Sequence, residues 1–132
     1  PNTTGACYLT GTQCDPEGVD RETAFQLLDN LHAHGAESVL ITSITVDGQH
    51  SVAGFNHMTG EHFLLGYTEI PVRFPGTGDI FSAVLIGHLL DGMELKPSVR
   101  KAMDAVYTLI DRNKDNKDKN AGIPVESYLY IL

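Results

Sequence analysis

The sequence predicts an α/β fold in which helices pack on a mixed sheet that contains an antiparallel meander. A run rich in β-branched residues at 38–46 precedes the turn pair Asp47-Gly48, a combination typical of a strand that enters a hairpin. Apolar residues recur at helical spacing over 21–34 and again from about 78 to 92, which indicates helices with a buried face. Strands grouped between helical segments are typical of a sheet with helices packed on it.

The first half of the chain is expected to contain one helix and three strands. Asp20 can cap a helix over about 21–34, and Gly35 stands where a C-terminal cap belongs. Three strands are then expected at 38–46, 50–56 and 61–68. Because only short turns separate these strands, they are expected to form an antiparallel meander.

The second half is expected to be mainly helical. The helix that begins near Gly78 is apolar over most of its circumference and ends at Gly92, so we expect it to be buried against a sheet. Another helix is expected from about Pro97, a residue favoured in a first helical turn. The polar run 112–120 is expected to be a solvated loop, and the alternating residues 125–131 are expected to form a last strand.

Composition limits the classes of function. With 132 residues, 42% of them hydrophobic, the chain can build a core, and residues 1–132 are expected to form a single domain. The net charge of −8 disfavours nucleic acid and anionic membranes as partners. No apolar run approaches a membrane span and no secretory leader is present, so a cytoplasmic location is expected. Cys7 and Cys14 lack zinc-site spacing and are expected to be reduced, structural thiols.

The segment Pro75-Gly76-Thr77-Gly78-Asp79 leads into the apolar helix. Its two glycines let the backbone approach a ligand closely, so that successive N–H groups can converge on a phosphate. The helix that follows adds its unpaired N–H groups and the positive end of its dipole. Asp79 can be interpreted either as a helix cap or as a base beside this anion site.

The six histidines raise the question of a metal site. His57 and His62 could face each other across a hairpin, but no third ligand has suitable spacing. We therefore expect surface or hydrogen-bonded histidines and no metal site. A serine hydrolase is not indicated either, because Ser82 lies a turn into a helix without a nucleophile elbow.

Three segments point to a known family. Residues 1–11 open with Pro-Asn and close with Leu-Thr-Gly, residues 39–43 end in a Thr-Ser pair, and residues 74–85 contain the glycine loop and the start of its helix. These segments resemble the pyridoxal (vitamin B6) kinase branch of the ribokinase superfamily, and the third is the most specific. The resemblance covers essentially all of this chain and roughly half of a typical family member. It implies the C-terminal part of a ribokinase-like three-layer α/β/α fold, the half that carries the nucleotide site and the catalytic loop.

The resemblance implies a transferase, namely a kinase that moves a phosphoryl group from MgATP to the hydroxymethyl group of pyridoxal, pyridoxine or pyridoxamine. Asp79 would be the base that receives the hydroxyl proton. The N–H groups of Gly76, Thr77 and Gly78 would stabilise the charge on the transferred group. The other ATP-binding residues that the resemblance implies are Asn2, Thr42, Ser43, Val72, Arg73 and Phe74. It also implies that the whole segment from Tyr67 to Phe74 lines the nucleotide side.

Gly5 departs from the family pattern. In the family, a glutamate stands three positions after the asparagine of the first segment and helps to organise magnesium and the phosphates. A hard cation such as Mg²⁺ binds through oxygen ligands, so a glycine at position 5 weakens the expected magnesium arrangement. A second departure is that the family's N-terminal half, which supplies most of the vitamin-binding pocket, is absent from these residues.

Two other functions stay open. A hydroxymethylpyrimidine kinase shares the glycine loop and differs in pocket residues that these segments do not include. Alternatively, the chain is a noncatalytic module that binds a nucleotide or another anion. The expected partners are ATP and a small vitamin B6-type alcohol, together with a second copy of the chain in a homodimer formed through an open sheet edge.

Overall fold

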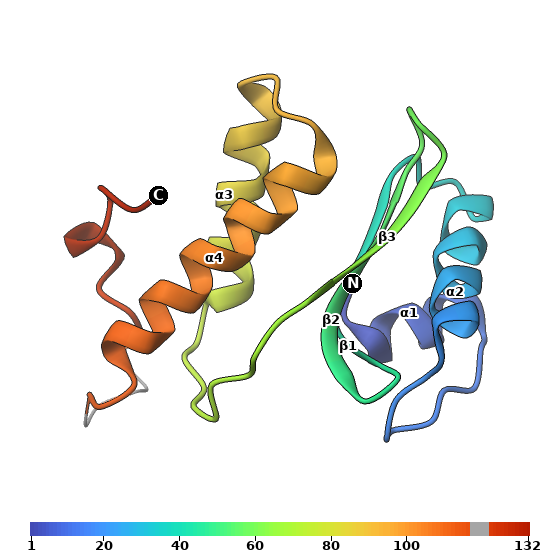
Figure 1. Ribbon diagram of the computed structural model, residues 1–132, viewed down its shortest axis with the longest axis horizontal. Coiled ribbons are helices and arrows are strands. Elements are labelled where there is room, and N and C mark those ends of the chain that lie inside the picture. The colour runs from blue at the N-terminus through green and yellow to red at the C-terminus, as the bar shows by residue number, and fades with distance from the viewer. Residues whose placement is uncertain (117–121) are drawn as a thin grey trace. The chain divides into compact units, whose positions relative to one another are not determined.

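The computed structural model of the chain describes residues 1–116 and 122–132 (Figure 1). These residues form two compact units, Pro1–Glu69 and Ile70–Leu132, and each unit has a hydrophobic core of its own. The interpretation of residues 1–132 as a single domain stays a prediction. Among the helices of the described residues, none combines the length and the apolar character that crossing a bilayer requires.

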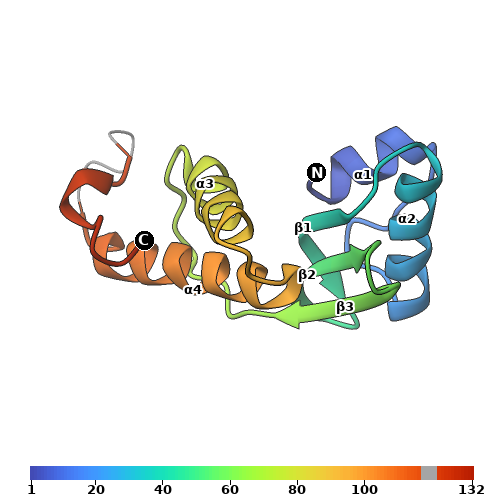
Figure 2. The same ribbon diagram turned by 90° about the horizontal axis from the view of Figure 1, so that it is seen from above.

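The first unit is a three-stranded antiparallel sheet with two helices packed on one face (Figure 2). Its strands, in spatial order, are β1 (Val39–Val46), β2 (Gln49–Asn56) and β3 (Glu61–Gly66). Helices α1 (Thr3–Thr10) and α2 (Arg21–Ala33) share one core with β1 and β2. The predicted meander and the predicted helix over 21–34 are confirmed.

Local signals explain α2 and the first hairpin. The Asp20 carboxylate accepts a hydrogen bond from the backbone N–H of Thr23 at 2.7 Å, as an N-cap residue does. Between β1 and β2, Asp47 and Gly48 both have positive φ, 48° and 79°. This is the backbone conformation of a two-residue hairpin turn whose twist matches that of the strands.

Helix α1 is present where no element was expected. The side-chain oxygen of Asn2 accepts a hydrogen bond from the N–H of Gly5 at 2.8 Å, which caps the start of the helix. Gly11 ends the helix in the left-handed conformation, with φ of 65°. An asparagine and a glycine at these two positions are ordinary boundary signals for a helix, but so short a segment has little apolar periodicity to accompany them.

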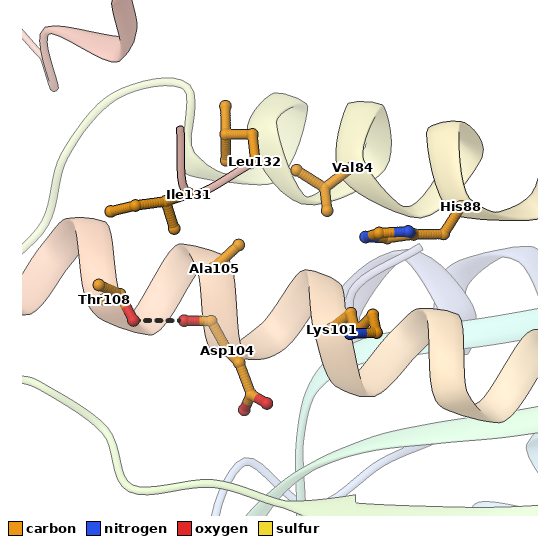
Figure 3. A pocket seen from close by; sticks show the side chains of 8 residues that line it. All are labelled: Val84, His88, Lys101, Asp104, Ala105, Thr108, Ile131 and Leu132. Atoms are coloured by element: carbon orange, nitrogen blue, oxygen red, sulfur yellow. Dashed lines mark hydrogen bonds between the residues drawn. The ribbon is translucent and has the colours of Figure 1, made fainter. Parts of the chain in front are cut away.

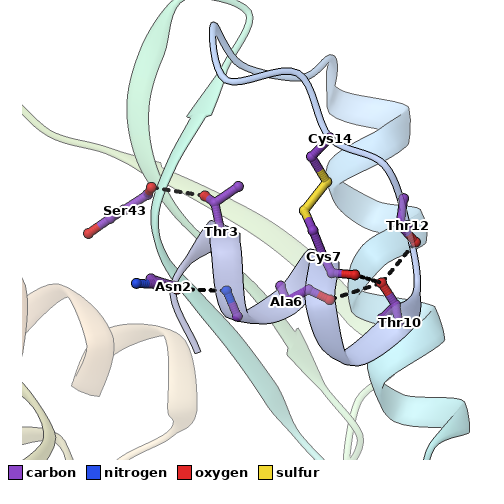
Figure 4. Close-up of a disulfide and its surroundings, with 9 residues drawn as sticks. Asn2, Thr3, Ala6, Cys7, Thr10, Thr12, Cys14 and Ser43 are labelled. Atoms are coloured by element: carbon purple, nitrogen blue, oxygen red, sulfur yellow. Dashed lines mark hydrogen bonds between the residues drawn. A yellow bond between two sulfur atoms is a disulfide. The ribbon is translucent and has the colours of Figure 1, made fainter.

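A disulfide joins Cys7 of α1 to Cys14 of the following loop, with the two Cα atoms 6.2 Å apart (Figure 4). The prediction of two reduced thiols is therefore wrong. The physical reason is that the chain turns back at the end of α1, where the N–H of Thr12 donates to the carbonyl of Cys7 at 3.0 Å. This reversal brings the two cysteines together, although their separation of 7 residues in sequence does not by itself indicate a disulfide.

The second unit contains α3 (Thr77–Leu90), α4 (Leu95–Asn113) and a short 3₁₀ helix, η1 (Val125–Ser127). Both long helices were expected, and α4 begins two residues before Pro97. The contact between them is apolar and includes Val84, Ala102 and Ala105. Of the α3 side chains only Val84 is buried, whereas Leu90 is 82% exposed. The prediction that this helix is buried against a sheet is therefore wrong for the described residues, and its apolar contact within the second unit is with α4.

The predicted last strand over 125–131 is also wrong. This segment forms η1 and a following turn, in which its backbone groups bond to near neighbours. The N–H of Tyr128 donates to the carbonyl of Val125 at 2.8 Å, and that of Ile131 donates to Tyr128 at 2.9 Å. Of the predicted polar loop over 112–120, the first two residues continue α4 and residues 117–121 lie outside the described residues.

Candidate functional site

The glycine loop of the second unit forms the beginning of α3. Gly76 occupies the N-cap position with φ of 84° and makes no side-chain cap bond, and the helix starts at Thr77. The carbonyl of Gly76 accepts the N–H of Ile80 at 3.0 Å, the first bond of the helix. Asp79 is therefore not the cap. It is the third helical residue, and its side chain is exposed next to the unpaired N–H groups of the first turn.

The space around the loop is open. Apart from its chain neighbours and the backbone of its own helix, a Cβ atom added at Gly76 or at Gly78 would meet no atom of the described residues within 4 Å. The positive φ of Gly76 would strain any residue other than glycine. The φ of Gly78 is not positive, so its backbone conformation is open to other residues. Nothing in the fold of this unit therefore explains why position 78 lacks a side chain. A ligand that approaches the backbone at this position would explain it.

The three residues before the loop differ in their surroundings. Phe74 is only 5% exposed and packs with Leu109 and Ile123, and half-buried Val72 lies against the same cluster. Arg73 is exposed. The aromatic ring of Phe74 thus anchors the loop in the core, while the guanidinium of Arg73 faces solvent, where a cation can meet an anionic ligand.

The first unit brings together the other predicted residues, Asn2, Thr42 and Ser43. Asn2 and Thr42 form an isolated parallel bridge, in which the N–H of Thr42 donates to the carbonyl of Pro1 at 2.9 Å. The hydroxyl of Thr3 donates to the carbonyl of Ser43 at 2.9 Å (Figure 4). The start of α1 and the Thr-Ser pair of β1 are thus in direct contact.

Thr42 and Ser43 form a bulge in β1. Ile41 pairs with Ala53 and Ile44 pairs with Ser51, so these two residues oppose a single residue of β2. Ser43 has φ of 57°, the left-handed conformation that residues with a Cβ atom seldom adopt. Bulges of this kind redirect side chains and are frequent beside active sites.

Tyr67, the first residue of the segment 67–74 that the resemblance implies on the nucleotide side, is a neighbour of this bulge. Burial raises the pKa of the Tyr67 phenol, a hydrogen bond with the Ser43 side chain acts in the opposite direction, and the charge of Glu69 adds to the increase. The His50 ring stacks on Tyr67, with ring centroids 6.0 Å apart, and its Nε2 lies 3.1 Å from a carboxylate oxygen of Glu69. Strand pairing brings these side chains together, and no motif in the sequence does so.

The two histidines considered as metal ligands have carboxylate neighbours. The Nε2 atom of His62 lies 2.6 Å from Asp29, and that of His57 lies 3.6 Å from Glu37. Within the described parts of the chain, no group of three or more His, Cys, Asp or Glu side chains is placed to hold a metal ion.

A pocket of about 250 Å³ lies in the second unit (Figure 3). Its lining comes from α3, α4 and the last two residues: Val84, His88, Lys101, Asp104, Ala105, Thr108, Ile131 and Leu132. His88 lies nine residues after Asp79 on the same helix, or about 13 Å along the axis at 1.5 Å per residue. This pocket contains none of the site residues predicted from the sequence.

The predicted residues therefore fall into two groups. Asn2, Thr42 and Ser43 belong to the first unit, and the segment from Val72 to Asp79 belongs to the second. Each group has a defined local geometry: a bulged strand beside a helix start in the first, and a glycine-capped helix with an exposed carboxylate in the second.

Comparison with known proteins assigns the family. The model of the phosphomethylpyrimidine kinase family matches residues 1–124. The pyridoxal kinase of Arabidopsis thaliana is 31% identical over 136 residues, which cover 99% of this chain and 43% of that protein. The chain therefore spans less than half the length of this relative.

Two solved structures agree with this assignment. Pyridoxal kinase from Lactobacillus plantarum is 26% identical, with a TM-score of 0.79 over 98% of this chain and 46% of that one. Pyridoxal kinase from Leishmania donovani, in complex with ADP and ginkgotoxin, is 25% identical, with a TM-score of 0.69 over 97% of this chain and 45% of that one. The predicted ribokinase-like α/β fold is confirmed. The chain belongs to the phosphomethylpyrimidine kinase family, and the proteins to which it is similar include pyridoxal kinases.

Proposed function

We propose that the protein is a kinase that transfers a phosphoryl group from ATP to the hydroxymethyl group of pyridoxal, pyridoxine or pyridoxamine. The observation that carries the proposal is the position of Asp79, an exposed carboxylate in the first turn of a helix capped by Gly76. The similarity to pyridoxal kinases over nearly the whole chain supports the substrate class. The ADP bound in the Leishmania donovani kinase supports the nucleotide.

In this proposal each group of residues has one task. The Asp79 carboxylate accepts the proton of the hydroxymethyl group while the hydroxymethyl oxygen attacks the γ-phosphorus of ATP. The bond from that phosphorus to the β–γ bridging oxygen breaks, and ADP leaves with that oxygen. The N–H groups of the Gly76-Thr77-Gly78 loop donate to the negative charge that develops on the transferred group. The other residues hold the nucleotide: Asn2, Thr42, Ser43, Val72, Arg73 and Phe74.

Magnesium fits the first unit poorly. Gly5 supplies no carboxylate, and the Asn2 side-chain oxygen already accepts a hydrogen bond from the N–H of Gly5. Since Mg²⁺ requires oxygen ligands or water, the segment from Asn2 to Gly5 does not form a ligand set for it. No step of the proposed reaction is assigned to the metal.

The proposal includes a cytoplasmic location, where ATP is available, and a homodimer. In a reducing cytoplasm the Cys7–Cys14 disulfide would be transient. Size-exclusion chromatography with light scattering tests the homodimer.

Two alternatives have separate signatures. The family model supports a hydroxymethylpyrimidine kinase, which would release ADP with hydroxymethylpyrimidine and not with pyridoxal. A noncatalytic module would bind ATP and release no ADP with either alcohol. Measuring ADP release with each alcohol therefore separates all three functions.

The decisive experiment uses Asp79→Asn in the protein at its native length. We expect turnover to fall roughly 10²-fold or more, the usual contribution of a general base, while the Kd for ATP changes little. Asp91→Asn is the matched control, because Asp91 is an exposed carboxylate at the opposite end of α3. Near-normal turnover of Asp79→Asn would show that the base lies elsewhere.

A further inference from the structure

The Thr-Ser pair of β1 has a backbone conformation that needs support from outside the strand. Thr42 and Ser43 together oppose one residue of β2, and Ser43 is left-handed with φ of 57°. For a residue with a Cβ atom this conformation is costly, and it persists only where surrounding contacts determine it. The question is which contacts do so.

One such contact comes from the start of α1. The Oγ1 hydroxyl of Thr3 donates a hydrogen bond to the carbonyl of Ser43 at 2.9 Å, across 40 residues of sequence (Figure 4). This bond engages the backbone of the left-handed residue itself. Thr3 is partly buried and Ser43 is exposed, so the bond lies at the surface of the first unit.

The start of α1 is itself held at this position. The N–H of Thr42 donates to the carbonyl of Pro1, and the Asn2 side chain caps the helix in which Thr3 is the first residue. These bonds place the Thr3 hydroxyl beside Ser43 before any ligand binds. Threonine also suits this position, because its branched side chain has few rotamers to lose.

We propose that Thr3 is a positioning residue that holds the Thr42-Ser43 bulge in the conformation that receives the nucleotide phosphates. The inference rests on the proposed nucleotide role of Ser43. It adds a residue that the family resemblance did not indicate, since the resemblance in this segment depends on Asn2 and on the Leu-Thr-Gly at its end.

Three variants of the native-length protein test the inference. Thr3→Val keeps the shape and removes the hydroxyl, Thr3→Ser keeps the hydroxyl, and Thr4→Val makes the same change at the exposed neighbouring residue. For Thr3→Val we expect the KM for ATP to rise about fivefold, the factor that corresponds to a hydrogen bond worth about 1 kcal/mol. The KM for pyridoxal and kcat should stay within about twofold, and Thr3→Ser and Thr4→Val should behave like the natural protein.

Hydrogen exchange gives a readout that does not depend on activity. Without the Thr3 hydroxyl, the amides of Thr42 and Ile44 should exchange about fivefold faster if the bond is worth about 1 kcal/mol. Unchanged exchange in Thr3→Val would overturn the claim that Thr3 holds the bulge. Faster exchange with an unchanged KM for ATP would overturn its role in nucleotide binding. If the natural protein releases no ADP, the proposed function fails, and the exchange result still decides whether Thr3 holds Ser43.

A double-mutant cycle guards against a variant that folds poorly. Ser43→Gly removes the Cβ atom that makes the left-handed conformation costly. In that background Thr3→Val should accelerate exchange at Ile44 less than it does beside Ser43. Equal effects in both backgrounds would contradict the proposal, because Thr3 would then not act on the conformation of Ser43.

Discussion

The side-chain oxygen of Asn2 lies 2.8 Å from the backbone nitrogen of Gly5, and a Cβ atom added at Gly5 would lie 3.2 Å from the same oxygen. The contact is close, so a larger residue must displace the Asn2 side chain by a few tenths of an ångström. Position 5 is the third residue of α1, and a carboxylate so close to a helix N-terminus interacts favourably with the positive end of the helix dipole. The departure from the family pattern thus lies directly against a residue proposed to bind ATP.

Gly5→Glu should strengthen ATP binding in the presence of magnesium. The added carboxylate supplies the oxygen ligand that this segment lacks, and groups that orient bound metal typically change its affinity roughly 10-fold or more. Titration of ATP with and without Mg²⁺ measures the effect, and Gly5→Gln is the uncharged control of similar size. If Gly5→Glu leaves the magnesium dependence unchanged, position 5 is not part of the metal site.

Reduction of the Cys7–Cys14 disulfide should destabilise the first unit. The bond closes a loop with a sequence separation of 7, and loop-closure entropy for so short a loop corresponds to about 2.5 kcal/mol. Urea unfolding with and without a reductant measures this loss, and Cys7→Ser should match the reduced protein. A reductant that changes the stability of Cys7→Ser as much as that of the natural protein would show that the disulfide is not the cause.

Adding a methyl group at Gly54 should destabilise the sheet. A Cβ atom there would overlap the ring of Phe63, whose side chain is 3% exposed and has little room to move. Overpacking of this kind costs about 1–3 kcal/mol, so we expect Gly54→Ala to lower the free energy of unfolding by that amount. In the double variant with Phe63→Leu the additional cost of Gly54→Ala should shrink, and a cost that persists would contradict the steric explanation.

The helix cap at Asp20 predicts a dependence of stability on pH. Hydrogen bonds from the Thr23 side chain and its N–H lower the pKa of Asp20 below its ordinary value of 3.8. Because the pKa of Asp20 is lower in the folded state than in the unfolded state, the cap stabilises the protein at pH values above the unfolded-state pKa. This stabilisation is lost as the pH falls through the folded-state pKa. Asparagine also caps helices but does not titrate, so between about pH 4 and 2 Asp20→Asn should lose less stability than the natural protein. Parallel losses in both proteins would show that the cap is not the titrating group.

Elements with signals in neighbouring residues could be predicted from the sequence. The helix cap at Asp20 and the turn at Asp47-Gly48 depend only on residues next to them in sequence, and both occur where they were expected. The disulfide and the Ser43 bulge depend on contacts between segments, such as that of Thr3 with Ser43, 40 residues apart. Alternation in the last segment predicted a strand, but within residues 1–116 and 122–132 no partner strand accompanies it, and its backbone bonds locally instead.

In the candidate site too, features with local sequence signals could be predicted, and features that depend on contacts between distant segments could not. Glycines before an apolar helix predicted a loop that leads into a helix, and the helix that begins at Thr77 leaves Asp79 exposed. The anion-binding role of this loop stays a prediction. The resemblance implied that the segment 67–74 lines the nucleotide side, but the contact of Tyr67 with the bulge residue Ser43 could not be predicted, because it arises only when the three strands pair. A residue that contacts a site only through the fold, as Tyr67 does, has no sequence motif that identifies it.

The last prediction concerns Gly78, whose lack of a side chain the fold of the second unit does not require. A Cβ atom at this position meets nothing within 4 Å, and the residue is the second of α3. Because alanine favours helices over glycine by about 1 kcal/mol, Gly78→Ala should keep or raise the free energy of unfolding. If the loop N–H groups bind phosphate, however, the methyl group occupies space that the phosphate needs.

We therefore expect Gly78→Ala to weaken ATP binding roughly tenfold, as a loss of about 1.4 kcal/mol would, without loss of stability. Gly87→Ala is the matched control, because it makes the same change on the same helix and its Cβ atom also meets nothing within 4 Å. Calorimetric titration with ATP and urea unfolding, applied to both variants, separate the two effects. Natural ATP affinity in Gly78→Ala would mean that the phosphates do not approach this turn of α3, whereas weaker binding in both variants would point to the helix as a whole.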